Sequence, residues 1–296
     1  MRDSFQNSWP ASNCKIGDAL SAATKQMRSA GIPDPINDSR ILLGYSLALK
    51  DERFYGLENT AITPKQLACY QVNIERRCNR EPTSRIIGRR AFWSLNLKLT
   101  PQALDPRPDS ETLIESMLRH FPDRNMPLKM LDLGTGTGCL LLSALYEFPH
   151  STGVGIDVDI ACVLLGQENA VRHGLEKRAI FKVGNWYAKI NSKFDVILCN
   201  PPYVPTNHIS KLQPEVFKFE PYIALDGGPD GLDCYRSLAP GLADLLAPDG
   251  LIFMEIGFDQ KFTVTEIMEK YTLKVNAIEK DLAAHDRCLI LSYKQC

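Results

Sequence analysis

The feature that most constrains the fold is a glycine-rich turn between an apolar strand and an apolar helix. Residues 134–138 read Gly-Thr-Gly-Thr-Gly, and apolar stretches lie on both sides, at 129–133 and 139–147. Glycine adopts positive φ at little cost, and without a Cβ it lets the backbone approach a ligand closely. Such a turn is typical of a ligand-binding edge of a parallel sheet. The sequence therefore predicts binding residues in this turn: Gly134, Thr135, Gly136, Thr137 and Gly138.

Short apolar runs alternate with helical segments through the C-terminal two-thirds of the chain. We expect strands at residues 129–133, 153–157, 179–183, 194–199, 251–256, 273–278 and 288–293. Alternating strands and helices predict an α/β fold with a doubly wound, seven-stranded, mostly parallel sheet. In such a sheet, ligands bind outside the carboxyl ends of the strands.

The N-terminal part has a different pattern. Apolar residues at helical spacing predict helices near residues 16–27, 36–49 and 63–80, which together form a small helical bundle. Several prolines and short apolar runs follow, so a hairpin or extended linker is expected before the sheet domain. The predicted division is a bundle at 1–83, a linker at 84–108 and a catalytic domain at 109–296.

Composition excludes several classes of protein. The 296 residues suggest about two domains, and 44% apolar with 23% charged residues is ordinary globular usage without a membrane span. The net charge of -1 lacks the cationic excess of a protein that holds nucleic acid through phosphates. Nine scattered cysteines without a Cys-x-x-Cys pair, and five histidines without ligand spacing, argue against disulfides and metal. We expect a reducing, cytoplasmic setting, and residues 1–10 show no secretory signal, which leaves an organelle transit peptide as the alternative.

Asp157 ends the second predicted strand, about twenty residues after the glycines. A carboxylate at this position can accept hydrogen bonds from both hydroxyls of a ribose. The alternative is a cap for the helix that begins near residue 160. The turn lacks the third glycine of the dinucleotide pattern, so a pyrophosphate is disfavoured. S-adenosyl-L-methionine, NAD and other adenosine ligands remain open from these residues alone.

The fourth strand is followed by Asn200, Pro201, Pro202 and Tyr203. The two prolines fix the backbone and supply no N–H, so the segment is a stiff turn at the carboxyl edge of the sheet. The side-chain oxygen of Asn200 and the main-chain oxygen of Pro201 can each accept one hydrogen of a planar –NH2 group. The Tyr203 ring can pack on the plane of that group. A simple proline-rich loop is the alternative.

The ordered set of motifs resembles the class I, Rossmann-like S-adenosylmethionine-dependent methyltransferases of the release-factor glutamine type (HemK/PrmC-like). The resemblance covers nearly the whole chain. It rests on the segments 106–111, 134–138, 184–186, 200–203, 220–221, 224–225, 227–232, 255–257 with Gln260, 280–282 and 286–287.

The resemblance implies methyl transfer from S-adenosyl-L-methionine to the side-chain amide of the glutamine in the Gly-Gly-Gln motif of peptide chain release factors. It implies that residues 134–138 hold the methionine end of the cofactor, that Asp157 holds its ribose and that Trp186 packs near its adenine. Residues 200–203 would hold the substrate glutamine, with Asn200 also beside the cofactor. Two departures are mild: Asn185 replaces a frequent acid, and Asp109-Ser110 replaces Glu-Thr.

Three alternatives remain. An amino-methyltransferase acting on a nucleic-acid base uses a similar turn, although the near-neutral charge speaks against nucleic acid as the direct substrate. A closer variant modifies a glutamine of a ribosomal protein. A non-catalytic module could retain the fold as a scaffold. The sequence favours a monomeric enzyme with a protein substrate and no membrane contact.

Overall fold

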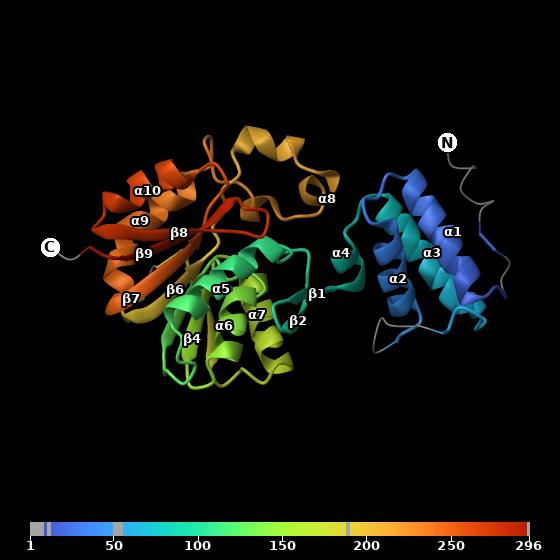
Figure 1. Cartoon of the computed structure of the whole chain (residues 1–296), viewed down its shortest axis with the longest axis horizontal. Coiled ribbons are helices and arrows are strands. Elements are labelled where there is room, and N and C mark those ends of the chain that lie inside the picture. Colours follow the sequence, from blue (N-terminus) through green and yellow to red (C-terminus); the bar gives the residue numbers. More distant parts are fainter. Residues whose placement is uncertain (1–8, 11–12, 50–55, 188–189, 295–296) are drawn as a thin grey trace. The chain divides into compact units, whose positions relative to one another are not determined.

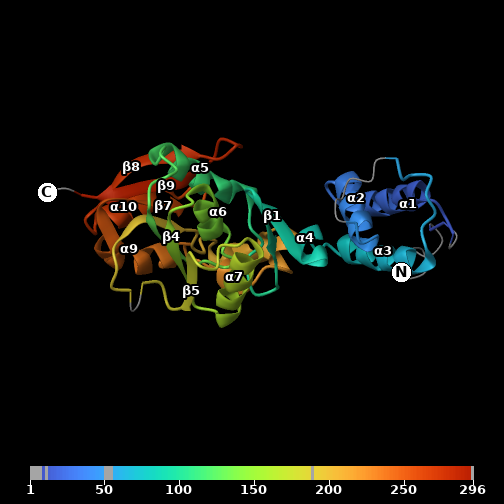
Figure 2. The same ribbon diagram turned by 90° about the horizontal axis from the view of Figure 1, so that it is seen from below.

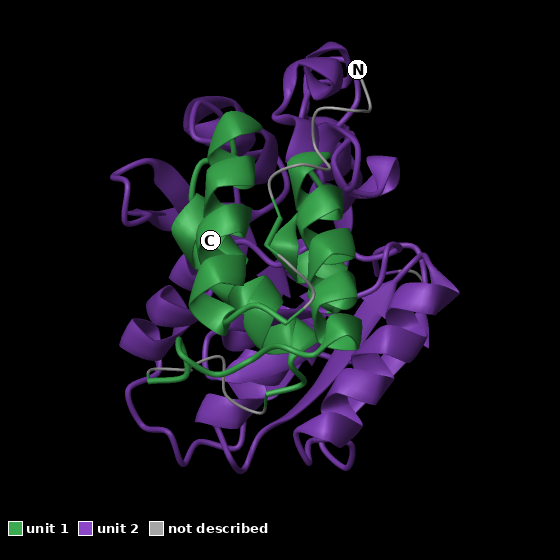
Figure 3. Ribbon diagram, turned by 90° about the vertical axis from the view of Figure 1, so that its right-hand side faces the viewer, with its two compact units in different colours: residues 1–88 green, residues 89–296 purple. Residues whose placement is uncertain are grey.

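The computed structural model describes residues 9–10, 13–49, 56–187 and 190–294. Most of the segment examined for a secretory signal therefore lies outside the described residues. The chain divides into two compact units, Met1–Gly88 and Arg89–Cys296 (Figure 3). Each unit has its own hydrophobic core, and each is described by itself.

The first unit is a bundle of helices, as the apolar spacing predicts. Its helices are α1 (Ile16–Ser29), α2 (Pro35–Ser46), α3 (Pro64–Cys78) and the short α4 (Thr83–Ile87). Helix α3 begins where expected because the Thr63 side chain accepts a hydrogen bond from the Gln66 backbone amide at 3.3 Å. Ala19, Ala23 and Met27 recur on one face of α1 and are completely buried. The predicted helical bundle is confirmed.

The boundary between the units lies after Gly88, which ends α4 in a left-handed conformation. The segment expected as a linker is divided there. Residues 84–88 complete the bundle, whereas the hairpin of β1 (Arg89–Phe92) and β2 (Leu95–Lys98) belongs to the second unit. The hairpin is held there because Phe92, Leu95 and Leu97 are buried in that unit's core.

The second unit contains a seven-stranded sheet with the strand order β5-β4-β3-β6-β7-β9-β8. All neighbouring strands are parallel except β9, which is antiparallel to both β7 and β8. The predicted α/β fold class is confirmed. The strands are β3 (Lys129–Leu133), β4 (Thr152–Asp157), β5 (Ala179–Val183), β6 (Phe194–Cys199), β7 (Leu246–Glu255), β8 (Leu273–Lys280) and β9 (Asp286–Tyr293).

Helices cover both faces of this sheet (Figures 1 and 2). One core contains side chains of α5 (Glu111–His120), α6 (Cys139–Glu147) and α7 (Ile160–Arg172). The other contains side chains of α9 (Asp233–Leu245) and α10 (Lys261–Glu269). Successive strand residues point to opposite faces, so Met130 enters the first core and Leu131 the second. The shorter elements are η2 (Pro108–Ser110), η3 (Thr206–Lys211), α8 (Pro214–Phe217) and η4 (Tyr222–Ala224).

The strand order places the two predicted motifs side by side. From β3 the chain proceeds outward to β4 and β5, and then returns to form β6 on the other side of β3. The carboxyl ends of β3 and β6 therefore form a topological switch point, where α/β sheets bind ligands. The glycine turn follows β3, and Asn200 follows β6. In the described part of the chain, no helix is both long enough and apolar enough to cross a membrane.

Candidate active site

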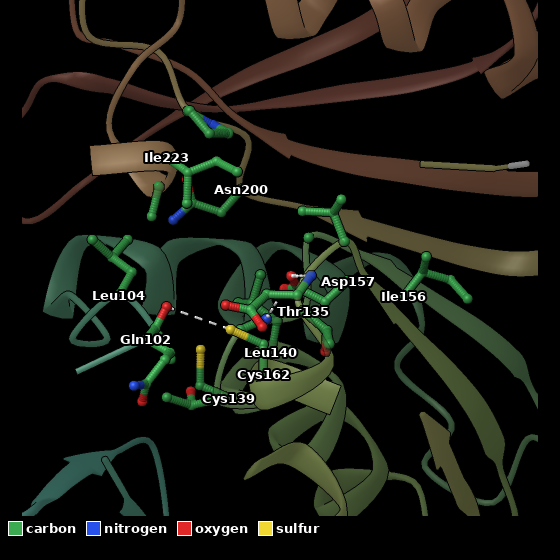
Figure 4. Close-up of a pocket in the computed structure, with 18 of the residues that line it drawn as sticks. Gln102, Leu104, Thr135, Cys139, Leu140, Ile156, Asp157, Cys162, Asn200 and Ile223 are labelled. Carbon is green, nitrogen blue, oxygen red and sulfur yellow. Dashed lines mark hydrogen bonds between the residues drawn. The ribbon is translucent and has the colours of Figure 1, made fainter. Parts of the chain in front are cut away.

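A cavity of about 320 Å³ lies at this switch point (Figure 4). Its lining comes from segments far apart in the sequence, and Figure 4 shows Asn200 and Ile223 on one side with Cys139 and Cys162 on the other. The lining includes Gln102, Ala103, Leu104, Ser110, Gly134, Thr135, Gly136, Thr137, Asp157, Asn185, Trp186, Asn200, Pro202, Ile223 and Ala224. The structure thus brings Asp157 and Trp186 to one cavity with most of the glycine turn and with Asn200 and Pro202.

The glycine turn requires its glycines for backbone conformation. Gly134 and Gly136 have φ of 74° and 54°, a region that costs other residues strain. The backbone amides of Gly134 and Thr135 both donate to the Ile156 carbonyl at 2.9 Å, which ties the turn to the end of β4. A Cβ added at Gly136 would meet no protein atom within 4 Å. The space beside Gly136 is therefore available to a ligand.

Gly138 serves packing rather than the cavity. It is absent from the cavity lining and precedes α6 with a φ of 80°. A Cβ at this position would lie 3.1 Å from the Phe181 ring and 3.2 Å from Leu142. Close packing of α6 on the sheet therefore explains this glycine, and its direct contact with a cofactor stays a prediction.

Asp157 lies at the end of β4 on the cavity. Its Oδ2 accepts the Gly136 amide at 2.8 Å and its Oδ1 accepts the Asp159 amide at 3.0 Å. A carboxylate has about four acceptor sites, so capacity for ligand hydroxyls remains. Burial raises the pKa of Asp157, while these amide donors lower it. Trp186 lines the same cavity, and its ring approaches the position that a Cβ at Gly134 would occupy.

Asp132 is a buried acid whose importance the sequence analysis missed. Its side chain is buried next to the glycine turn, where Thr135 Oγ1 donates a hydrogen bond to its Oδ2 at 2.6 Å. Burial raises the pKa of Asp132 to about 7, against the opposing effect of the Thr135 and Leu141 donors. Its Oδ1 has no partner with hydrogen-bonding geometry among the described residues. A buried acid with one unpaired oxygen therefore lies close to the glycine turn.

The turn after β6 presents acceptors. Asn200 Nδ2 donates to Ser110 Oγ at 3.0 Å. The other end of this side-chain amide, the Oδ1 atom, is therefore available to accept a hydrogen bond from a ligand. Within the described residues, neither this oxygen nor the Pro201 carbonyl oxygen accepts a hydrogen bond. Two unsatisfied acceptors on adjacent residues suit a ligand with two hydrogens on one nitrogen. Pro202 lines the cavity beside them.

Tyr203 is held by its hydroxyl and by its main chain. The hydroxyl donates to Glu255 Oε1 at 3.2 Å, and Gln260 Nε2 donates to the Tyr203 carbonyl at 3.0 Å. Burial raises the pKa of Tyr203, and the nearby Glu255 carboxylate raises it further, so the phenol stays protonated. Neither Tyr203 nor Pro201 is part of the cavity lining, and packing of the Tyr203 ring on a substrate stays a prediction.

In the sequence, Ser110 and Glu255 belong to longer motifs, and neither has a predicted role. In the structure, Ser110 accepts a hydrogen bond from Asn200 and donates one to Glu255, although both residues lie far from Asn200 in the sequence. A further contribution comes from the segment after Tyr203, because Ile223 and Ala224 line the cavity. Glu220 fixes that segment by accepting from Arg107 Nη2 at 2.6 Å and from the Asp105 amide at 3.0 Å. Spacing alone cannot reveal such distant partners.

The residues present fit S-adenosylmethionine. The open space at Gly136, the carboxylate of Asp157 and the aromatic Trp186 suit a nucleoside. Among the described residues, no group of three or more His, Cys, Asp or Glu side chains is arranged to hold a metal ion.

Two protein families match parts of this chain. Residues 18–88 match the PrmC N-terminal domain family, and residues 108–217 match the methyltransferase small domain family. A release factor glutamine methyltransferase from Rhodospirillum rubrum is 42% identical over 93% of this chain and 84% of the relative. One from Caulobacter vibrioides is 38% identical over 92% of this chain and 94% of the relative.

A solved methyltransferase structure from Pyrococcus furiosus shares the fold, with a TM-score of 0.51 at 20% identity over 70% of this chain and 92% of that chain. The predicted resemblance and the predicted S-adenosylmethionine cofactor are therefore both confirmed. The extent and identity of the two sequence matches show that this chain belongs to the release factor glutamine methyltransferase family.

Proposed function

We propose that this protein transfers a methyl group from S-adenosylmethionine to the side-chain amide nitrogen of the glutamine in the Gly-Gly-Gln motif of a peptide chain release factor. One observation supports this proposal above the others. The Oδ1 atom of Asn200 and the carbonyl oxygen of Pro201 belong to adjacent residues and have no partners in the described residues. Asn200 and Pro202, on either side of this carbonyl in the sequence, both line the cavity that the glycine turn borders. A primary carboxamide has the two hydrogens that such a pair accepts.

An amide nitrogen is a weak nucleophile because its lone pair is delocalised into the carbonyl. The protein therefore contributes chiefly through orientation, which supplies up to roughly 7–11 kcal/mol in the best intramolecular cases. Asn200 and Pro201 would hold both hydrogens and direct the nitrogen lone pair toward the cavity. Their oxygens also stabilise the positive charge that develops on nitrogen during the attack.

When bound, S-adenosylmethionine supplies a methyl group on a positively charged sulfur. The substrate nitrogen would take this methyl group, leaving a neutral thioether, and would release one proton to water. Asp157 would hold the ribose hydroxyls, and Trp186 would pack against the adenine. In its ionised form, Asp132 would favour the cationic cofactor over its neutral product through charge.

The partner, compartment and assembly state complete the proposal. A protein glutamine is favoured over a nucleic-acid base because the chain's net charge is -1. A ribosomal-protein glutamine is the second candidate, since the same pair of acceptors would hold it. The free cysteines of the described residues suit the reducing cytoplasm, and we propose that the enzyme acts there as a monomer.

The decisive experiment incubates the full chain with purified release factor and radiolabelled S-adenosylmethionine, and maps the label by mass spectrometry. One methyl group is expected on the Gly-Gly-Gln glutamine. A release factor with that glutamine changed to alanine is the matched control and should remain unlabelled. Ribosomal proteins, DNA and RNA are tested in parallel. Label on any of these in preference to the release factor contradicts the proposal.

A further inference from the structure

We propose that Ser110 and Glu255 are positioning residues that fix the direction of the Asn200 side-chain amide, so that its oxygen and not its nitrogen faces the substrate amide. The inference rests on the proposed function, because it concerns how that substrate is held. It assigns a role to two buried side chains that do not themselves touch the reacting atoms.

The direction follows from counting protons. Both oxygens of Glu255 accept hydroxyl hydrogens, from Ser110 at 2.5 Å and from Tyr203 at 3.2 Å, which is the pattern of an ionised carboxylate. Ser110 has one hydroxyl hydrogen and gives it to Glu255. The Ser110 oxygen can then only accept, and the partner within reach is Asn200 Nδ2 at 3.0 Å. The Oδ1 atom of Asn200 is thereby directed away from Ser110.

An asparagine side chain without this constraint could turn by 180°, because its two ends have the same shape. The reversed amide would present N–H groups to the N–H groups of the substrate. Such a donor–donor contact repels the substrate instead of holding it. Glu255 therefore determines, through Ser110, which chemical face the Asn200 turn offers.

Burial makes the arrangement rigid. Ser110 and Glu255 are 2% and 1% exposed, so water does not compete for their hydrogen bonds. Burial raises the pKa of Glu255, whereas the Ser110 and Tyr203 hydroxyls and the nearby Arg287 guanidinium lower it and favour the carboxylate. Arg287 is itself paired with Asp281 at 3.0 Å. The carboxylate is thus balanced without a direct donor that would occupy either oxygen in place of the hydroxyls.

The Ser110 hydroxyl has no competing structural role at the start of α5. Ser110 occupies the cap position of that helix, but its side chain makes no capping hydrogen bond. Replacing it with alanine therefore removes the link to Asn200 without removing a helix cap. Ser143 offers a matched control, since it is a completely buried serine whose Oγ has no hydrogen-bond partner among the described residues.

The first test compares Ser110→Ala, Ser110→Thr and Ser143→Ala in steady-state methylation of release factor. Misplacing a substrate-orienting group costs roughly 10–100-fold, so we expect Ser110→Ala to lower kcat by about that factor while the Kd for S-adenosylmethionine stays within about twofold. Ser110→Thr keeps the hydroxyl and should retain kcat, as should Ser143→Ala. Unchanged kcat in Ser110→Ala, or equal loss in Ser110→Thr, overturns the proposal.

Glu255→Gln tests the origin of the direction. The amide has the size of the carboxylate but offers a donor and an acceptor, so it no longer compels Ser110 to donate. We expect a loss of kcat comparable with that of Ser110→Ala. Because the two residues act through one chain of hydrogen bonds, the double variant should lose about as much as the worse single variant. Multiplied losses would show independent roles and contradict the proposal.

A second measurement does not depend on methyl transfer. In protein labelled with ¹⁵N-asparagine, the side-chain signal of Asn200, identified by its absence in Asn200→Ala, should show slow hydrogen exchange in wild type and Ser143→Ala but fast exchange in Ser110→Ala. Equal exchange in all of these proteins overturns the positioning role. A wild-type protein that leaves release factor unlabelled but shows the Ser110-dependent signal contradicts the proposed function and retains the positioning role.

Discussion

The two sides of the cavity are built in different ways. The glycine turn is held largely through its own main chain, since the amides of Gly134 and Thr135 bind the Ile156 carbonyl and the amide of Gly136 binds the Asp157 side chain. The Asn200 turn is held by side chains from distant segments: Ser110 lies 90 positions earlier in the sequence, and Gln260 binds the Tyr203 carbonyl from 57 positions later. The cofactor side thus depends on backbone conformation, and the substrate side depends on tertiary packing.

The difference explains how each side can fail. A turn that needs positive φ is damaged by any Cβ, whatever the chemistry of the new side chain. A turn whose direction is imposed by buried hydrogen bonds is damaged by loss of one polar atom, even where the backbone is unaffected. Substitutions on the two sides of the cavity should therefore differ in whether they disturb backbone conformation or buried hydrogen bonds.

The largest effect is expected at Asn200. In Asn200→Ala the substrate loses one of its two acceptors, and loss of one such oriented group typically costs about 100–1000-fold in kcat. The Kd for S-adenosylmethionine should change little, because the glycine turn remains intact. Initial rates at saturating cofactor and calorimetric binding measure the two quantities. Normal turnover on release factor would show that Asn200 does not hold the substrate.

A smaller effect, this time on folding, is expected at Gly138. Gly138→Ala combines left-handed strain with a Cβ 3.1 Å from Phe181, and we expect a loss of about 2–3 kcal/mol in the free energy of unfolding. Gly174→Ala is the control, because Gly174 has a φ of 68° with open space around it and should lose only about 1 kcal/mol. Denaturant unfolding measures both. Equal losses would show that packing against Phe181 contributes nothing.

Asp157→Ala should weaken cofactor binding by about 10–100-fold, since the ribose loses a charged acceptor and Gly136 loses the partner of its amide. At saturating cofactor, kcat should change far less than in Asn200→Ala. Isothermal titration calorimetry gives the Kd, with Asp157→Asn as a graded variant. Unchanged affinity in Asp157→Ala would show that this carboxylate serves only to hold the Gly136 and Asp159 amides.

The smallest expected effect is a pH dependence of cofactor affinity. The pKa of Asp132, raised to about 7 by burial, should fall when a cation binds nearby, so binding releases a proton and strengthens as pH rises. Between pH 6 and pH 8 the affinity should increase by up to about tenfold. Asp132→Asn should remove this increase. If the variant keeps it, another group is responsible, such as Asp157, whose pKa burial also raises.

Most of the fold follows from local patterns. The strands predicted at 129–133, 179–183 and 194–199 have the same bounds in the structure, because short apolar runs between turns leave few alternatives. Strand β7 begins earlier than expected, at Leu246, since the polar stretch around Asp249 interrupts its apolar pattern. The hairpin falls within the predicted linker, and only its packing in the first core of the second unit assigns it to that unit.

The site divides in the same manner. Gly134, Gly136 and Pro202 can be identified from the sequence, because glycine and proline mark unusual backbone conformations, and all three line the cavity. Asp132, Ser110 and Glu255 cannot be identified in this way, because a buried acid or serine looks like any other until its neighbours are known. Their roles depend on hydrogen bonds that form in the folded chain, and residue spacing in the sequence does not predict these bonds.

The sequence by itself determined the alternation of strands and helices, the glycine turn and the stiff Asn200 turn, since each depends on φ and on apolar periodicity within a few residues. The tertiary structure alone decided the boundary after Gly88, the position of β9 between β7 and β8, and the direction of the Asn200 amide. The physical reason is distance along the chain. Backbone preferences depend on residues that are neighbours in the sequence, whereas a buried hydrogen bond requires two partners that only folding brings together.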